Sequence, residues 1–222
     1  MSPSGKKKVQ RESILVLSAH SDDFVLGAGG TIAAYAAEGK KVYCVVFSYG
    51  ERSHPWLKEN VVQKMRAKEA FDASKVLGCK TTFLDLTEFK FRQQYDERKD
   101  IQELLLRLLE RTKPTKIFTH SPEDPHPDHK AVQEITRQLY EQLTPKPEVY
   151  IYSVWNPVSF KTSLPALYVN ISKTFSTKLR ALKMFPSQRV HIIYPVFLLF
   201  YRAIKDGIKI KTWFGEHFFR IL

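Results

Sequence analysis

The sequence predicts an α/β protein with a Rossmann-like, mostly parallel sheet that carries helices on both faces, followed by an aromatic, basic C-terminal extension. Two observations predict this class. Short apolar runs rich in valine and isoleucine alternate with longer helix-like segments as far as Trp155. The chain of 222 residues, 43% of them hydrophobic, can bury one core of this size, whereas two separate cores would each be small.

Strands are expected where apolar runs lack helical spacing. The first, Arg11–Ala19, contains four consecutive aliphatic residues from Ile14 to Leu17, which indicates a strand buried on both faces. The other strands are expected at Lys41–Ser48, Thr82–Leu86, Lys116–His120 and Glu148–Ser153.

Helices are expected between these strands. Asp100–Thr112 is the clearest, because its isoleucine and leucines recur at helical spacing. Gly39 and Gly78 are typical residues for ending the two preceding helices. The remaining helices are expected at Val25–Glu38, Asn60–Leu77, Pro127–Leu143 and Ser176–Phe185, the last with Ser176 as its N-cap.

The two ends of the chain differ from the rest. We expect a flexible basic tail at residues 1–12, one domain over residues 13–188, and a C-terminal segment, 189–222, that packs on this domain or forms a lid. Residues 171–222 carry ten lysines and arginines against two acids, which accounts for most of the net charge of +12. This charge favours an anionic membrane surface or a phosphorylated substrate. No segment resembles a nucleic-acid-binding motif, so no nucleic acid is expected as a partner.

Membrane spans, export and disulfides are not expected. The longest apolar stretch, Val190–Tyr201, is shorter than the ~18–20 residues that span a bilayer and contains Pro195. The N-terminus has no secretory signal. The two cysteines give no disulfide framework, and Cys44 is expected as a buried reduced thiol. We therefore expect a cytoplasmic protein, at most peripherally bound to a membrane.

Ionisable side chains follow two of the predicted strands. Three directly follow the first strand, and three more follow the strand that ends at His120: His20, Asp22, Asp23, His126, Asp128 and His129. Because ligands bind at the carboxyl ends of strands in open α/β sheets, we expect both groups to meet there. Imidazole nitrogens and carboxylate oxygens suit zinc, and hydrolysis also needs a base and an acid. The alternative is that the two aspartates are ordinary helix caps.

Four segments carry a family resemblance. AHSDDF at Ala19–Phe24 resembles the AHPDDE motif of the GlcNAc-phosphatidylinositol and LmbE-like N-deacetylases, and HPDH at His126–His129 matches that family's second motif. Arg66–Gly78 resembles its R-x-x-E…A…LG segment, and Lys178–Gln188 its K…AL…SQ element. The four segments occur in the family's order.

The resemblance implies roles at the matching positions. His20, Asp23 and His129 would be three zinc ligands. Asp22 would be the general base that activates water, and His126 would stabilise the oxyanion or protonate the amine.

Further positions would support the reaction or bind the substrate. By the same resemblance Asp128 would orient His126, and Arg66 would face the substrate pocket. From their places after strands, His54 and Trp155 are candidate substrate contacts. Two positions depart from the first motif: Ser21 replaces a proline and Phe24 replaces a glutamate.

The implied reaction is zinc-dependent removal of the N-acetyl group from a GlcNAc-containing molecule, with release of acetate. The substrate would be GlcNAc-inositol, its phospholipid, or a small GlcNAc saccharide. Two alternatives stay open: an amidase acting on a GlcN-linked thiol conjugate, and a catalytically inactive Rossmann-like binding module. Association into a homo-oligomer also stays open.

Overall fold

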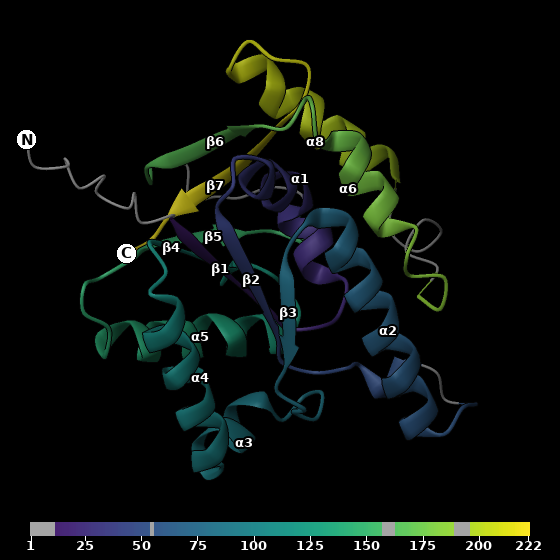
Figure 1. Ribbon diagram of the computed structural model, residues 1–222, viewed down its shortest axis with the longest axis vertical. Coiled ribbons are helices and arrows are strands. Elements are labelled where there is room, and N and C mark those ends of the chain that lie inside the picture. The colour runs from purple at the N-terminus through teal and green to yellow at the C-terminus, as the bar shows by residue number, and fades with distance from the viewer. Residues whose placement is uncertain (1–11, 54–55, 157–162, 189–195) are drawn as a thin grey trace, which may run out of the picture.

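The computed structural model describes residues 12–53, 56–156, 163–188 and 196–222, and its centre is a seven-stranded sheet (Figure 1). The strands are β1 Ser13–Ser18, β2 Lys41–Val46, β3 Lys80–Phe83, β4 Lys116–His120, β5 Glu148–Tyr152, β6 Ala166–Asn170 and β7 Gly215–Arg220. Their order in the sheet is β3-β2-β1-β4-β5-β7-β6. The first five strands pair in parallel, whereas β7 runs antiparallel to β5 and β6.

Helices cover both faces of the sheet, which confirms the predicted α/β class (Figure 1). One face carries α1 Asp23–Ala37, α2 Glu59–Leu77, α6 Phe175–Leu182 and α8 Val196–Lys209. The other face carries α3 Phe91–Glu97, α4 Lys99–Thr112 and α5 Pro127–Glu141. A short 3-10 helix, Glu51–Ser53, follows β2.

The central strand β1 explains why two apolar layers form. Successive side chains of a strand point to opposite faces. Accordingly Ile14 and Val16 belong to the core under α1 and α2, whereas Leu15 and Leu17 belong to the core under α4 and α5. All four are buried, so this aliphatic run fixes the centre of the sheet.

Most predicted bounds differ from the structure by one or two residues, and two elements differ by three at one end. The third strand ends at Phe83, because Asp85 has a φ of 58° and breaks the extended backbone between two buried leucines. The sixth helix begins at Phe175, with Thr174 rather than Ser176 at the N-cap. The buried ring of Phe175 stacks on Phe214 with centroids 4.3 Å apart, and this contact sets the start of the helix.

The C-terminal part adds elements that the sequence did not reveal. Residues 196–222 form α8 and β7, and β7 lies between β5 and β6 in the sheet. The short helix α3 and the edge strand β6 were likewise not predicted. In the part of the chain that the structure describes, no helix is long and apolar enough to cross a membrane.

A buried ion pair joins the C-terminal strand to the rest of the molecule. Lys178 of α6 and Glu216 of β7 lie 2.7 Å apart and are both buried. The Glu216 carboxylate also accepts the backbone N–H groups of Gly30 and Thr31 in α1, at 3.1 and 2.7 Å. The Lys178 ammonium also donates to the carbonyl of Leu26 at 2.8 Å. The pair therefore ties α1, α6 and β7 together.

Replacing Glu216 with alanine is expected to lower the free energy of unfolding by about 3–5 kcal/mol, because Lys178 would stay buried without its partner charge. Urea unfolding followed by circular dichroism measures this. The control is Glu103→Ala, whose exposed pair with Arg107 contributes about 0.5 kcal/mol or less. An equal loss of unfolding free energy in the two variants would show that the buried pair contributes no more than the exposed one.

Candidate active site

The two groups of ionisable residues meet at the carboxyl edge of the sheet. The first lies in the turn between β1 and α1, and the second at the start of α5, which follows β4, the neighbour of β1. Ser18 holds the first turn, since its hydroxyl donates to the carbonyl of His20 at 2.7 Å and accepts the N–H of Phe24 at 3.1 Å. His126 occupies the N-cap of α5, with Pro127 in the first turn.

Three side chains converge as a set of metal ligands. The ligand atoms of His20, Asp23 and His129 all lie within 4.8 Å of one another. The Oδ2 atom of Asp23 is 3.3 Å from Nδ1 of His20 and 3.2 Å from Nε2 of His129. All three residues are buried. Two imidazoles and a carboxylate, with a position left for water, form a donor set typical of catalytic zinc.

His129 supplies a test of whether a metal ion fits. Both of its ring nitrogens are buried, and neither makes a hydrogen bond of acceptable geometry. Yet Nε2 lies near Asp23, and Nδ1 lies 3.0 Å from Oδ1 of Asp124. A ring nitrogen close to a carboxylate but off the hydrogen-bond line is what a shared cation between them would require. The residues present therefore fit a metal ion.

A second carboxylate supports each of the two histidines. Nδ1 of His129 faces Asp124, and Nε2 of His20 faces Oδ2 of Asp128 at 3.2 Å. Each ring thus turns one nitrogen toward Asp23 and the other toward an outer carboxylate, as metal-ligating histidines commonly do. Asp124 was not singled out in the sequence. Asp128 was expected to orient His126, but its carboxylate contacts His20 instead.

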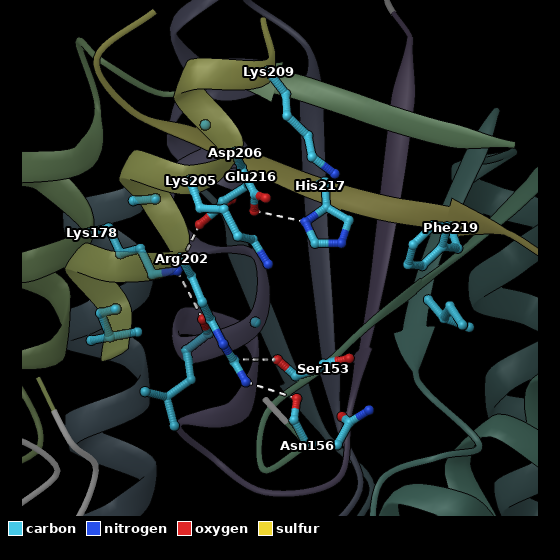
Figure 2. Close-up of a pocket in the computed structure, with 16 residues that line it drawn as sticks. Ser153, Asn156, Lys178, Arg202, Lys205, Asp206, Lys209, Glu216, His217 and Phe219 are labelled. Carbon is cyan, nitrogen blue, oxygen red and sulfur yellow. Dashed lines mark hydrogen bonds and ion pairs between the residues drawn. The ribbon is translucent and has the colours of Figure 1, made fainter. Parts of the chain in front are cut away.

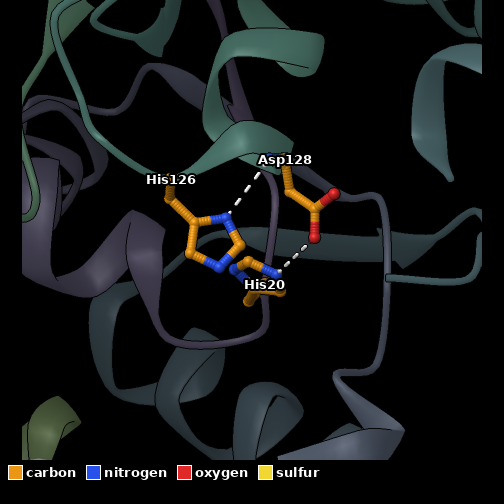
Figure 3. Close-up of side chains that lie close together, drawn as sticks. All are labelled: His20, His126 and Asp128. Carbon is orange, nitrogen blue, oxygen red and sulfur yellow. Dashed lines mark hydrogen bonds and ion pairs between the residues drawn. The ribbon is translucent and has the colours of Figure 1, made fainter. Parts of the chain in front are cut away.

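Two other groups of side chains have metal-like spacing, and some of their atoms are already engaged in hydrogen bonds. The first is His20, His126 and Asp128 (Figure 3). In it the backbone N–H of Asp128 donates to Nδ1 of His126 at 3.2 Å, while Oδ1 of Asp128 accepts the N–H of Phe89 at 2.8 Å. The second is His120, Asp124 and His129, in which Nε2 of His120 accepts the N–H of Ala19 at 2.9 Å.

The pKa values in the site show that it favours positive charge. Burial alone would lower the pKa of His20, but hydrogen bonds with Asp128 and Asp23 outweigh it and raise the pKa to about 10. Burial would also lower the pKa of His129, but the carboxylates of Asp23 and Asp124 outweigh it and raise this pKa to about 9. Since zinc binds neutral imidazole, a metal ion would take the place of these protons.

Asp22 is not a helix cap. It occupies the N-cap position of α1, but its side chain makes no capping hydrogen bond. Its carboxylate lies 3.6 Å from Nη2 of Arg66. Burial raises the pKa of Asp22, and the Arg66 guanidinium opposes this. A carboxylate with a raised pKa that is free of capping is suited to act as a base.

Arg66 holds the loop that carries Asp22. It is 3% exposed, and it donates from Nε to the hydroxyl of Ser21 at 3.0 Å and from Nη1 to the carbonyl of Gly50 at 2.8 Å. Gly50 has a φ of 72°, and a side chain there would overlap the guanidinium. Ser21, which replaces the motif's proline, thus supplies an acceptor that proline lacks. Phe24, which replaces the glutamate, is buried in the apolar core.

Exposed aromatic side chains lie at the site. The side chain of Trp155 is 43% exposed, and the backbone N–H of this residue donates to Oδ2 of Asp124 at 3.1 Å. The ring of Phe89, 61% exposed, stacks on His126 with centroids 5.6 Å apart, and its φ of 65° is rare for a bulky residue. His54, the other predicted substrate contact, lies outside the described residues.

Glu88 is a further acid of the site. Its Oε1 atom lies 3.6 Å from Nε2 of His20. Neither Glu88 nor Phe89 carries a sequence signal, since both lie in a loop without motif or periodicity.

The family model described as PIG-L, GlcNAc-PI de-N-acetylase, matches residues 15–140, which include both the His20 and the His129 segments. The chain belongs to the PIG-L family. Among curated relatives, 4-oxalmesaconate hydratase of Pseudomonas putida is 28% identical over 80% of this chain and 74% of its own. A probable N-acetyl-α-D-glucosaminyl L-malate deacetylase of Bacillus cereus is 26% identical over 79% and 83%.

Solved structures confirm the fold. N,N′-diacetylchitobiose deacetylase of Pyrococcus horikoshii superposes with a TM-score of 0.75 at 22% identity, over 95% of this chain and 84% of that one. The PIG-L family is one of enzymes, with deacetylases and a hydratase among the relatives of this chain.

The two weaker motif segments also contact each other. The carboxylate of Glu69 accepts the backbone N–H and the hydroxyl of Ser187, at 2.9 and 2.6 Å.

Proposed function

We propose that this PIG-L family protein is a zinc-dependent N-deacetylase that releases acetate from the GlcNAc unit of a small glycoside or glycolipid. The observation that carries the proposal is the convergence of His20, Asp23 and His129 next to Asp22, a half-buried carboxylate that makes no capping hydrogen bond. Zinc held by the first three residues would supply Lewis-acid activation of water and of the amide carbonyl. The family match to a GlcNAc-PI de-N-acetylase supports the substrate class.

Asp22 and His126 divide the proton chemistry. Asp22 takes a proton from the attacking water as its oxygen bonds to the acetyl carbon, and returns it to the amine as the C–N bond breaks. Nδ1 of His126 accepts a backbone N–H, so its own proton lies on Nε2. Burial lowers the pKa of His126, which favours the neutral ring. Nε2–H can then donate to the oxyanion.

The remaining side chains position these groups or the substrate. Arg66 holds Asp22 through its contacts with Ser21 and Gly50. Trp155 and Phe89 present exposed aromatic faces on which a hexose can stack, and His54 is a further candidate contact.

Acetate release is the direct test. Purified protein of known metal content is incubated with GlcNAc, GlcNAc-inositol and diacetylchitobiose, and acetate is measured. Acetate formation that stops on chelation and returns with zinc supports the proposal. Turnover of 4-oxalmesaconate without acetate release would replace it with the hydratase activity named for the Pseudomonas relative. Turnover of GlcN-linked thiol conjugates alone would make the protein an amidase. Absence of both metal and turnover would favour the inactive binding module.

We also propose that α8 contacts an anionic membrane. Four apolar side chains recur on one face of this helix, with exposed fractions from 45% to 75%: Phe197, Tyr201, Ile204 and Ile208. Trp213, 83% exposed, follows the helix. The exposed Lys211 lies close to Trp213 in the sequence, and cationic residues beside apolar ones are typical of helices that rest on anionic lipid.

Vesicle flotation is expected to recover the protein with phosphatidylserine-containing vesicles and not with phosphatidylcholine alone. The variant Phe197→Ser/Ile208→Ser should lose this binding, because it removes apolar area from the contact. Phe71→Ser, which changes an exposed phenylalanine of α2, is the matched control. Wild-type protein that stays unbound contradicts the proposal. A change in molar mass by light scattering in the α8 variant would instead identify this face as a homo-oligomer contact.

A further inference from the structure

A cavity outside the candidate active site lies where β5 and β7 separate. These strands pair only at Tyr150↔Arg220 and Ile151↔Phe219, whereas β7 pairs with β6 at five successive positions. The cavity, of about 270 Å³, is lined by residues of both strands and of α8 (Figure 2). No residue that lines it belongs to the proposed catalytic or metal-binding set.

The cations of this cavity come from one face of α8. Arg202, Lys205 and Lys209 follow one another at intervals of three and four residues. Figure 2 shows the ammonium ends of Lys205 and Lys209 and the ring of His217 pointing into the same space. Basic side chains from both α8 and β7 thus converge on one place.

The acids of the cavity do not balance these cations. Glu216 is engaged by Lys178 and by two backbone N–H groups. Asp206 is bound through Oδ2 to Nδ1 of His217 at 2.7 Å. Lys209 has the Tyr168 hydroxyl as its partner at 3.1 Å, and Lys205 lies 5.9 Å from the ring of Tyr201, so neither contact neutralises charge.

The donor geometry favours phosphate over carboxylate. A carboxylate has two oxygens in one plane and matches an arginine fork, whereas a tetrahedral phosphate can also be held by separate lysine ammonium groups. Here the guanidinium of Arg202 already donates to the carbonyls of Ser153, Val154 and Asn156. Two separate ammonium groups remain that can reach different oxygens of a tetrahedral group, beside Nε2 of His217, whose Nδ1 is bound to Asp206.

Apolar side chains complete the wall of the cavity: Leu26, Ile151, Leu199, Ala203 and Phe219. With its volume near the lower end of small-molecule sites, the cavity has room for a small organic group beside a phosphate. We propose that the cavity between β5, β7 and α8 binds the phosphate group of a small phosphate ester, with Lys205, Lys209 and His217 as its polar contacts.

Inorganic phosphate is the first probe, titrated calorimetrically at constant ionic strength so that general charge screening does not change. Saturable binding is expected for wild type. Lys205→Gln/Lys209→Gln should weaken it about tenfold or more, since hydrogen bonds between charged groups are stronger than those between neutral groups. Lys64→Gln/Lys68→Gln is the matched control, because these exposed lysines of α2 are also four residues apart. Circular dichroism checks that both variants fold.

Three results would overturn the site. They are an absence of saturable binding in wild type, an equal loss in both double variants, and binding that disappears when metal is removed by chelation, which would place the phosphate at the metal centre. Unchanged binding after chelation supports the cavity, whatever the result of the acetate assay. Glycerol phosphate and phosphatidic acid vesicles then distinguish a soluble ester from a lipid headgroup, since the double lysine variant should lose whichever one the wild type binds.

Discussion

Asp22→Asn is expected to reduce kcat for acetate release by about 10²–10⁴-fold, the usual contribution of a general base, while the protein keeps its metal. The reason lies in the geometry. Asp22 contacts Arg66 at 3.6 Å but is not among the three side chains whose ligand atoms converge. Asparagine preserves the shape of the side chain and the contact with the guanidinium, but it cannot accept the proton of water.

Metal content and turnover must be measured on the same preparation. Asp72→Asn is the matched control, since it makes the same change on the exposed surface of α2 and should leave both quantities unchanged. Loss of metal together with activity in Asp22→Asn would place Asp22 in the ligand set. Retention of full turnover would mean that another group takes the proton, and Glu88, 3.6 Å from Nε2 of His20, is a candidate.

The parallel part of the fold could be predicted because its signals are local. The aliphatic run Ile14–Leu17 marks a strand buried on both faces, and the leucine stripe of α4 marks a one-sided helix. The C-terminal elements were harder to place. α8 has apolar residues on its exposed face as well as on its buried face, so its pattern does not say which face packs on the sheet. β6 is mostly half-buried, and β7 finds its partner β5 more than sixty residues earlier in the chain.

The candidate site was also predictable only in part. The motifs placed His20, Asp22, Asp23 and His129 together because they sit at the ends of neighbouring strands. The contacts of Phe89 and Glu88 were not predictable. They depend on a loop whose backbone takes a positive φ at Phe89 and on hydrogen bonds between residues far apart in sequence, such as Phe89 and Asp128.

Substitution of a metal ligand is the second change expected to have a large effect. Asp23→Asn and His129→Gln are each expected to abolish stoichiometric zinc binding, because both side chains belong to the converging set of three ligands. Inductively coupled plasma mass spectrometry of dialysed protein measures this. His126→Gln should keep its zinc, because His126 lies outside the converging set of His20, Asp23 and His129. Zinc loss in His126→Gln and retention in Asp23→Asn would move the ion to the group of His20, His126 and Asp128.

Asp124→Asn separates a ligand from a supporting residue. If Asp124 only orients His129 through Nδ1, its loss should weaken zinc affinity about 10–100-fold without abolishing binding, as for other carboxylates behind a metal-bound histidine. Total loss of zinc would instead favour the group of His120, Asp124 and His129. That group requires His129 to bind through the nitrogen facing Asp124, and it would leave Nε2 and Asp23 buried side by side with nothing between them. Weakened zinc binding in Asp124→Asn, together with no zinc binding in Asp23→Asn, fits an ion held between His20, Asp23 and His129.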